Sequence, residues 1–236
     1  MQVGAIIAGA GESMRFSQGM SSSSVTDRKQ FRLLGGEPLV FVTLRPFLEC
    51  DLIDSVVLVV PEEALDWTEQ RIRNNRWQKG VRVVPGGLQR QESVRNGLEA
   101  VPDRCEVVVV QDAARPFVRV SWIEETARLC AEYDGAIVAV KTGDTLKRVE
   151  EGVVLETVER RGVWQAQTPQ AFRKASLVSA FNRAASMGWK GTDEAQLVER
   201  DGGRVAVVQG SPLNIKITSP EDWALAESLW EGSKGD

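Results

Sequence analysis

Short apolar runs alternate with amphipathic stretches along most of the 236-residue chain. Runs of four to eight aliphatic residues bounded by glycine or proline are typical of buried strands, and the amphipathic stretches between them predict helices. The predicted strands are residues 3–8, 55–60, 81–84, 106–110, 136–140, 204–208 and 214–217. The predicted helices are residues 38–49, 62–75, 91–100, 121–132 with Ser121 as N-cap, 173–187, 193–200 and a last one that begins at Ser219 and Pro220.

This order predicts an α/β fold: a Rossmann-like, mostly parallel twisted sheet with helices on both faces. The alternation breaks at residues 141–163, where Glu151 and Gly152 form a turn between alternating residues, which predicts a β-hairpin. The hairpin is too polar for a core. It is either a surface hairpin or an arm that reaches another subunit. No repeat or linker divides the chain, so we expect a single domain over 1–236 with the arm at about 141–163.

Composition limits the classes of binding partner and the cellular compartment that we expect for the protein. The net charge of −4 argues against a broad basic surface for nucleic acid, although it does not exclude binding one nucleotide. The three cysteines are far apart and form no CxxC pair, so neither a zinc site nor a disulfide framework is indicated. We read no signal peptide and no membrane span in the sequence. A cytoplasmic protein with no membrane partner is therefore expected.

The sequence contains no histidine. Ser–His–Asp triads, Cys–His dyads and histidine-ligated metals are therefore excluded. The chemistry must rest on carboxylates, cations, hydroxyls and backbone donors. Phosphoryl and nucleotidyl transfer suit this inventory, because they depend on positioning and charge neutralisation more than on a general base.

The segment QDAARPFV, residues 111–118, directly follows a run of four valines. It places Asp112 and Arg115 at the carboxyl end of a predicted strand, where open α/β sheets bind ligands. An acid beside a base at that edge suits a metal ion and the phosphate that accompanies it. The alternative is an Asp–Arg pair that only orders a loop.

Two glycine-rich loops also follow predicted strands. In AGAGESMRF, residues 8–16, Gly9 and Gly11 allow backbone amides to approach an anion closely. The basic residues that come after them are Arg15, Arg28 and Lys29. The loop has neither the Walker pattern nor the dinucleotide fingerprint, so a tight turn is the alternative. The second loop, in PGGLQRQESV at 85–94, leads into a helix with Arg90 and Ser93 in its first turn. It indicates a polar-ligand site or a simple helix cap.

With these motifs in this order, the chain resembles the 2-C-methyl-D-erythritol 4-phosphate cytidylyltransferases of the non-mevalonate isoprenoid pathway over nearly its whole length. The matching pieces are residues 8–11, RKQF at 28–31, the segment 86–94, QDAARPF at 111–117, DTLKR at 144–148, ERRG at 159–162, QTPQ at 167–170, TDEA at 192–195 and NIKIT at 214–218. Each piece is short, but the ordered set is specific. A paralogous group that couples CTP to ribitol 5-phosphate shares most of them.

The resemblance implies CTP as co-substrate, Mg²⁺ or another divalent cation as cofactor, and a homodimer formed through the arm. The catalytic residues that it implies are Lys29, Lys216 and Arg15. The nucleotide would lie against Ala8, Gly9, Ala10, Gly11, Gly87, Arg90 and Ser93, with Asp112 on the metal. Methylerythritol phosphate would be bound by Arg115, Thr145, Arg160, Thr168 and Thr192. On the arm, Thr145 and Arg160 would serve the neighbouring subunit's site.

The chain departs from the family pattern in its first loop. Ser13 stands where the family usually has an arginine, and Arg15 is the candidate to replace it. The segment before Lys29 is longer than usual, Arg28 replaces a proline, and Gln111 replaces a histidine. Three hypotheses follow: transfer of CMP from CTP to methylerythritol phosphate, the same transfer to another polyol phosphate such as ribitol 5-phosphate, and a nucleotide-binding homologue without turnover.

Overall fold

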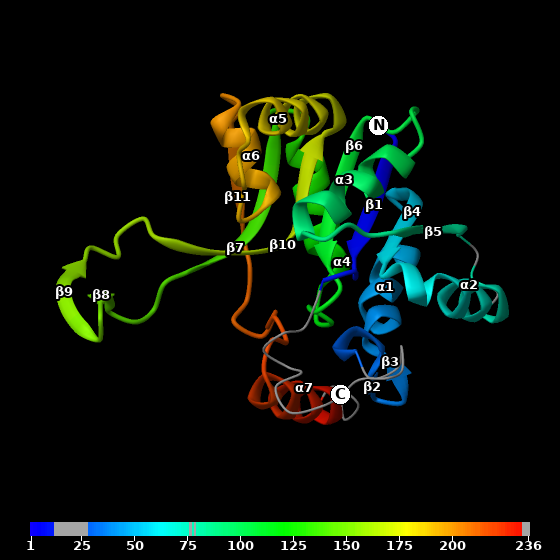
Figure 1. Ribbon diagram of the computed structural model, residues 1–236, viewed down its shortest axis with the longest axis horizontal. Helices are drawn as coiled ribbons and strands as arrows, with labels where there is room; N and C mark the ends of the chain where they lie inside the picture. The colour runs from blue at the N-terminus through cyan, green and yellow to red at the C-terminus, as the bar shows by residue number, and fades with distance from the viewer. Residues whose placement is uncertain (12–27, 76, 78, 233–236) are drawn as a thin grey trace.

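The computed structural model describes residues 1–11, 28–75, 77 and 79–232. Its centre is a seven-stranded sheet with the order β11-β7-β10-β6-β1-β4-β5 (Figure 1). Five of its strands are β1 (Val3–Ala8), β4 (Ile53–Val60), β5 (Val81–Pro85), β6 (Val107–Asp112) and β7 (Gly135–Lys141). The other two are β10 (Trp164–Arg173) and β11 (Val205–Gln209). Within the described residues, β10 is antiparallel to both its neighbours and the other neighbouring pairs are parallel.

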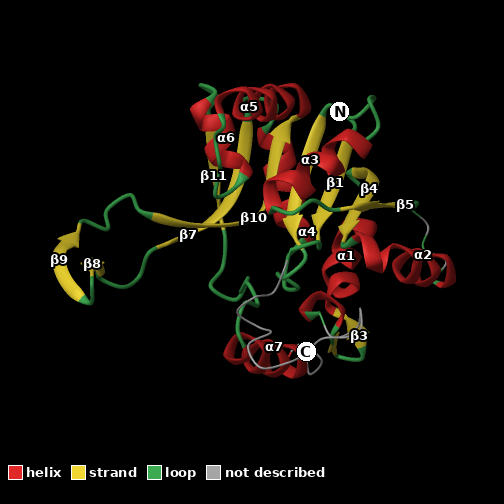
Figure 2. Ribbon diagram, viewed as in Figure 1, coloured by secondary structure: helices red, strands yellow, loops and turns green. Residues whose placement is uncertain are grey.

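Helices cover both faces of the sheet (Figure 2). They are α1 (Leu39–Glu49), α2 (Leu65–Asn74), α3 (Arg90–Ala100), α4 (Val120–Leu129), α5 (Lys174–Met187), α6 (Glu194–Arg200) and α7 (Pro220–Gly232). Alternate side chains of β1 explain the two layers. Ala5 and Ile7 belong to the core with α1 and α4, whereas Ile6 belongs to the core with α3, α5 and α6. The mostly parallel α/β fold predicted from the sequence is confirmed.

Short elements complete the fold around these layers. A 3-10 helix, η2 (Lys29–Phe31), leads into the two-stranded ribbon β2 (Leu33–Leu34) and β3 (Glu37–Pro38). A second 3-10 helix, η3 (Glu62–Ala64), precedes α2, so the predicted helix 62–75 is a 3-10 turn followed by an α-helix. α7 packs on the ribbon through a separate apolar cluster that includes Leu34 and Trp223.

Two predictions about elements were wrong. Residues 214–217 are not a strand: the chain there is irregular, and no described strand pairs with it. Its isoleucines, Ile215 and Ile217, pack in the apolar cluster that the ribbon, α1 and α7 share. Ser121 is not the N-cap of α4, which begins at Val120 with Arg119 in the cap position. The cap lies two residues earlier than predicted, with Trp122 N donating to the Arg119 carbonyl at 3.1 Å.

The predicted hairpin is present as β8 (Leu146–Glu150) and β9 (Val153–Val158). Its turn residues Glu151 and Gly152 both have positive φ, 49° and 81°, as a tight two-residue hairpin turn requires. Figure 1 shows the hairpin projecting sideways from the end of β7, away from the body of the protein. In the described ranges, none of the helices combines the length and apolar character that crossing a bilayer requires.

Candidate functional site

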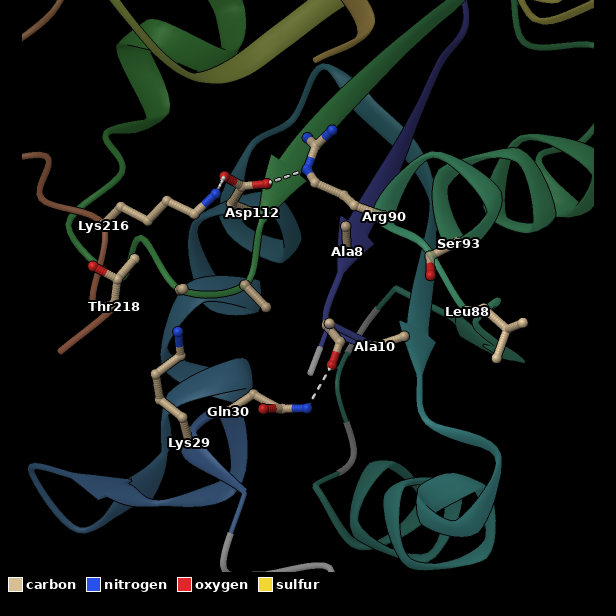
Figure 3. A pocket seen from close by; sticks show the side chains of 14 residues that line it. Ala8, Ala10, Lys29, Gln30, Leu88, Arg90, Ser93, Asp112, Lys216 and Thr218 are labelled. Carbon is tan, nitrogen blue, oxygen red and sulfur yellow. Dashed lines mark hydrogen bonds and ion pairs between the residues drawn. The ribbon is translucent and has the colours of Figure 1, made fainter. Parts of the chain in front are cut away.

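A cavity of about 500 Å³ lies at the carboxyl ends of β1 and β6 (Figure 3). It is lined by Ala8, Gly9, Ala10, Gly11, Lys29, Gln30, Leu88, Arg90, Ser93, Asp112, Ala113, Ala114, Lys216 and Thr218. These residues come from both glycine loops, the QDAARPF segment, η2 and the irregular segment before α7. The parallel strands bring them together, because their carboxyl ends meet at one edge of the sheet.

The two glycine loops touch each other at the cavity wall. A Cβ on Gly86 would lie 2.1 Å from the Cβ of Ala10, so a larger residue at position 86 would push the loops apart. The first loop is held from below by two hydrogen bonds at its first glycine: Gly9 N donates to the Val59 carbonyl at 2.8 Å, and Gln30 Nε2 donates to the Gly9 carbonyl at 2.9 Å. Residues 8–11 of the first loop therefore form, with the second loop, a floor that these contacts hold in place.

Asp112 is the last residue of β6 and is only 7% exposed. Its Oδ1 accepts from Arg90 Nε at 2.9 Å, and its Oδ2 lies 2.7 Å from Lys216 Nζ. The two cations approach it from opposite sides of the cavity (Figure 3). Arg115 Nε lies 4.0 Å from Oδ2. Asp112 thus stands at the centre of three cations.

Burial alone would raise the pKa of Asp112, but Arg90, Lys216 and Arg115 hold it well below its usual range. The carboxylate is therefore ionised at any pH at which the protein would work. Burial disfavours the charged form of Arg90 and of Arg115 and so acts to lower the pKa of each. It lowers the pKa of Arg115, whereas Asp112 and Glu194 outweigh it and raise the pKa of Arg90.

Glu194, at the start of α6, is a second buried acid, 1% exposed. Both its oxygens accept from the guanidinium of Arg90, at 2.7 and 2.9 Å. Burial nevertheless raises the pKa of Glu194, and the contact with Arg90 opposes that shift. Arg90 is thus shared between two carboxylates, one facing the cavity and one behind it.

A fourth cation of the site is Lys29 in η2, which donates from Nζ to the Ile217 carbonyl at 2.5 Å. Lys29 and Lys216 therefore both lie beside the segment that leads into α7, and both line the cavity. With Arg90 they make three cations against one acid, Asp112, among the described residues that line the cavity, and Arg115 lies 4.0 Å from that acid. This excess of positive charge suits a polyanion such as a triphosphate.

The structure brings most of the predicted nucleotide and catalytic residues together in this cavity. Five predicted substrate residues do not line it: Arg115, Thr145, Arg160, Thr168 and Thr192. Gly87 lies just outside it, where its N–H donates to Ser93 Oγ at 3.1 Å. Thr168 is buried and accepts from the backbone of Asp112 at 3.2 Å. Arg15 and Ser13 lie outside the described residues.

Three buried polar residues at or behind the cavity received no role from the sequence: Gln30, Glu194 and Asn214. Each lies inside a motif that carries the resemblance: Gln30 is next to Lys29, and Glu194 and Asn214 are each two residues from a residue that did receive a role. The feature that distinguishes these three residues is their burial, which the sequence does not reveal. A buried polar side chain in an α/β enzyme needs partners, and those partners come from segments far apart in the sequence.

Asp112 fits a role as the single protein ligand of a divalent cation. The described residues contain no group of three or more acids or cysteines that could hold a metal by themselves. Mg²⁺ is commonly bound by one or two carboxylates and completed by substrate phosphates. One oxygen of Asp112 would have to exchange its contact with Lys216 or Arg90 for the cation.

Comparisons with known proteins show the family to which the chain belongs. A model of the 2-C-methyl-D-erythritol 4-phosphate cytidylyltransferase family matches residues 3–231. The enzyme of that name from Geobacillus thermodenitrificans is 41% identical over 229 residues, which cover 97% of each chain. The enzyme of the same name from Geobacillus kaustophilus is 40% identical over 229 residues, again with 97% of each chain covered.

Solved structures of the same family have a fold similar to that of this chain. The 4-diphosphocytidyl-2C-methyl-D-erythritol synthase of Anaerococcus prevotii superposes with a TM-score of 0.84 at 28% identity, covering 98% of this chain and 96% of the other. The 2-C-methyl-D-erythritol 4-phosphate cytidylyltransferase of Thermus thermophilus superposes with a TM-score of 0.79 at 30% identity, covering 98% of this chain and all of the other.

Proposed function

The chain belongs to the 2-C-methyl-D-erythritol 4-phosphate cytidylyltransferase family, and on that premise we propose that it transfers CMP from CTP to 2-C-methyl-D-erythritol 4-phosphate. The products are 4-diphosphocytidyl-2-C-methyl-D-erythritol, an isoprenoid precursor, and pyrophosphate. The observation that carries this proposal is the position of Asp112 between Arg90 and Lys216, at the mouth of the two glycine loops.

In the proposed reaction a phosphate oxygen of the polyol phosphate attacks the α-phosphorus of CTP. The new O–P bond forms as the bond from the α-phosphorus to the bridging oxygen breaks, and pyrophosphate leaves with that oxygen. The attacking phosphate is already an anion, so no general base is required. The barrier is the approach of two anions, which fixed cations lower most effectively where charge develops.

Each residue has a role in this proposal. The backbone of residues 8–11 cradles the triphosphate with Lys29, and Lys216 stabilises charge that builds at the α-phosphate. Gly87, Arg90 and Ser93 lie around the cytosine. Arg15 lies outside the described residues and keeps its proposed catalytic role from the resemblance alone. Asp112 holds the divalent cation, which supplies Lewis-acid charge to the phosphates when it is bound.

The polyol phosphate side of the proposal involves the arm. Arg115, Thr145, Arg160, Thr168 and Thr192 bind methylerythritol phosphate, and Thr145 and Arg160 act on the neighbouring subunit's site. Four apolar side chains of the hairpin are more than half exposed: Val149, Val153, Val154 and Leu155. A lone two-stranded hairpin is marginal in water, so a symmetric partner that covers these side chains would stabilise it.

We therefore propose a cytoplasmic homodimer in which each chain is one nucleotidyltransferase domain with an arm. Sedimentation equilibrium tests the assembly: the expected mass is twice the 26.0 kDa of the chain. A monomer at the concentrations used for assays would contradict the shared site.

Pyrophosphate release tests the activity. Purified protein is assayed with CTP and Mg²⁺, and with methylerythritol phosphate or ribitol 5-phosphate as acceptor. We expect turnover with methylerythritol phosphate and a much lower kcat/KM with ribitol 5-phosphate. The reverse preference would assign the chain to the paralogous activity. CTP binding without turnover on either acceptor would favour the inactive homologue, for which the altered first loop is the sequence feature.

A further inference from the structure

Lys216 lies in the irregular segment 211–218 that joins β11 to α7. No ladder of strand or helix hydrogen bonds holds this segment, so the position of its lysine depends on individual contacts. One comes from the QDAARPF segment, where Arg115 Nη1 donates to the Asn214 carbonyl at 2.7 Å. On the far side of Lys216, Ile217 N–H donates to the Ala114 carbonyl at 2.9 Å, and Lys29 Nζ donates to the Ile217 carbonyl. On the near side, the side chain of Asn214 supplies further contacts.

Asn214 is completely buried. Its Nδ2 donates to the Thr168 carbonyl at 2.9 Å and to Gln167 Oε1 at 3.2 Å. Thr168 Oγ1 in turn accepts from the backbone N–H of Asp112 at 3.2 Å. Two hydrogen bonds therefore connect Asp112 through Thr168 to Asn214, which is two residues before Lys216. The ion pair between Lys216 and Asp112, at 2.7 Å, closes the ring.

We propose that Asn214 is a positioning residue that sets the Lys216 ammonium against Asp112 and the nucleotide site. This inference rests on the proposed function, because it gives Lys216 its task at the α-phosphate. Burying an amide costs free energy unless the amide is hydrogen-bonded. At position 214 the amide contributes through its two N–H groups, which point to Thr168 and Gln167. Those donors fix the segment to the same residue that fixes the end of β6.

The defect expected of Asn214→Ala depends on when Lys216 contacts the α-phosphate during the proposed reaction. Lys216 acts in the proposed reaction as charge develops, so loosening it lowers kcat and leaves the ground-state affinity for CTP nearly unchanged. Misplacing a catalytic group by about 1 Å can cost about 100-fold in rate. For Asn214→Ala we expect kcat to fall about 10- to 100-fold, with the KM for CTP changed by less than about threefold.

The control is Thr126→Ala. Thr126 is also completely buried, and its Oγ1 donates to the Trp122 carbonyl within α4, which contributes nothing to the cavity lining. This variant should lose stability in thermal unfolding but keep its kcat. Asn214→Ser is made in parallel, because a smaller polar residue is better tolerated if the alanine variant does not fold.

Two measurements separate positioning from general destabilisation. In a double-mutant cycle, adding Asn214→Ala to Lys216→Ala should cause little further loss of kcat, because the residue acts through the lysine. Without any substrate, an amine-reactive reagent followed by peptide mass spectrometry should label Lys216 faster in Asn214→Ala than in wild type or Thr126→Ala. Labelling reports the lysine directly and does not need turnover.

Additive losses in the cycle, or an unchanged labelling rate at Lys216, would overturn the assignment. Failure of both position-214 variants to fold would also overturn it, since Asn214 would then serve folding. A wild-type protein without pyrophosphate release on any polyol phosphate would refute the proposed function instead. In that case the labelling comparison still decides whether Asn214 positions Lys216.

Discussion

The cavity and the hairpin arm both carry residues proposed to bind substrate, but the protein holds them in opposite ways. In the cavity, Asp112 is buried and contacts Arg90 and Lys216 before any ligand arrives. On the arm, Thr145 is exposed, and Arg160 is exposed and donates to the Gly143 carbonyl of its own hairpin base. Side chains at the strand ends are thus fixed by the fold, whereas those on the arm are not fixed against the site.

The two regions differ in the contacts that fix their side chains. Burying charges is expensive, so a buried cluster persists only if every member is paired, and the pairing then fixes its geometry. The arm has no core of its own, and its paired charges, such as Arg148 and Glu156 at 2.6 Å, are exposed and contribute little. The cavity is therefore preorganised by one chain, whereas the arm would gain its order from the partner of the proposed homodimer.

Removing the central acid should give the largest effect. We expect Asp112→Asn to lower kcat about 100- to 1,000-fold, as loss of a preorganised electrostatic group does. The neutral amide also binds a divalent cation more weakly than a carboxylate, so raising Mg²⁺ should recover part of the activity. Pyrophosphate release across a Mg²⁺ titration measures both effects.

The matched control is Asp103→Asn, which removes an exposed acid paired with Lys174. It should leave kcat unchanged. Circular dichroism should show that the Asp112→Asn protein is folded, although less stable, because Arg90, Lys216 and Arg115 lose their shared counter-charge. Near-normal turnover of the folded variant at ordinary Mg²⁺ would remove Asp112 from the metal and from the mechanism.

The arm should give an intermediate effect that is specific to one substrate. A hydrogen bond to a charged group contributes about 1.5–3 kcal/mol, so Arg160→Ala should raise the KM for the polyol phosphate about 10- to 100-fold. The KM for CTP should change little. Arg161→Ala, the neighbouring exposed arginine, is the control and should behave as wild type.

Mixing variants tests whether the arm crosses between subunits. Arg160→Ala and Asp112→Asn proteins should partly restore each other, because one site of each mixed dimer is intact. Random exchange of equal amounts restores about a quarter of the wild-type sites. If exchange is shown to occur and no activity returns, each arm serves its own subunit or is purely structural, and the contrast with the cavity disappears.

The same contrast explains what could be predicted from the sequence. Buried valine runs such as residues 107–110 fix strands, and strands followed by polar motifs fix the edge where a site forms. Asp112, Arg90, Lys29 and Lys216 were predicted as site residues, and they share one cavity. The hairpin was predicted from its turn residues, Glu151 and Gly152.

Other features depend on contacts that periodicity does not encode. The segment 214–217 alternates like a strand, but its backbone bonds singly to Arg115 and Ala114 and forms no ladder. The Asn214 side chain bonds to Thr168 and Gln167. In the sequence, Glu194 is an ordinary residue near the start of a predicted helix. Only the folded chain shows that both its oxygens accept from the Arg90 guanidinium. Such buried polar partners are 46 to 104 residues apart, beyond any local pattern.

The smallest effect should come from the base side of the cavity, which lies within the preorganised region. Ser93 is buried, accepts from Gly87 N–H at 3.1 Å and donates to the Gln89 carbonyl at 3.1 Å, so it holds the shape of the second glycine loop. CTP and UTP differ in donor and acceptor at one edge of the base. A loop that bonds the amino group leaves buried groups unpaired with UTP, so wild type should strongly favour CTP.

Loss of one such hydrogen bond costs about 0.5–1.5 kcal/mol, so Ser93→Ala should reduce the ratio of kcat/KM for CTP over UTP about two- to tenfold. Ser228→Ala, which removes an exposed hydroxyl in α7, should leave the ratio unchanged. The measurement is pyrophosphate release with each nucleotide at a saturating concentration of the polyol phosphate. Equal kcat/KM for CTP and UTP in wild type would show that the second loop does not read the base. The preorganisation of the cavity would then serve only the phosphates, because its charged cluster would remain intact while its base recognition would be absent.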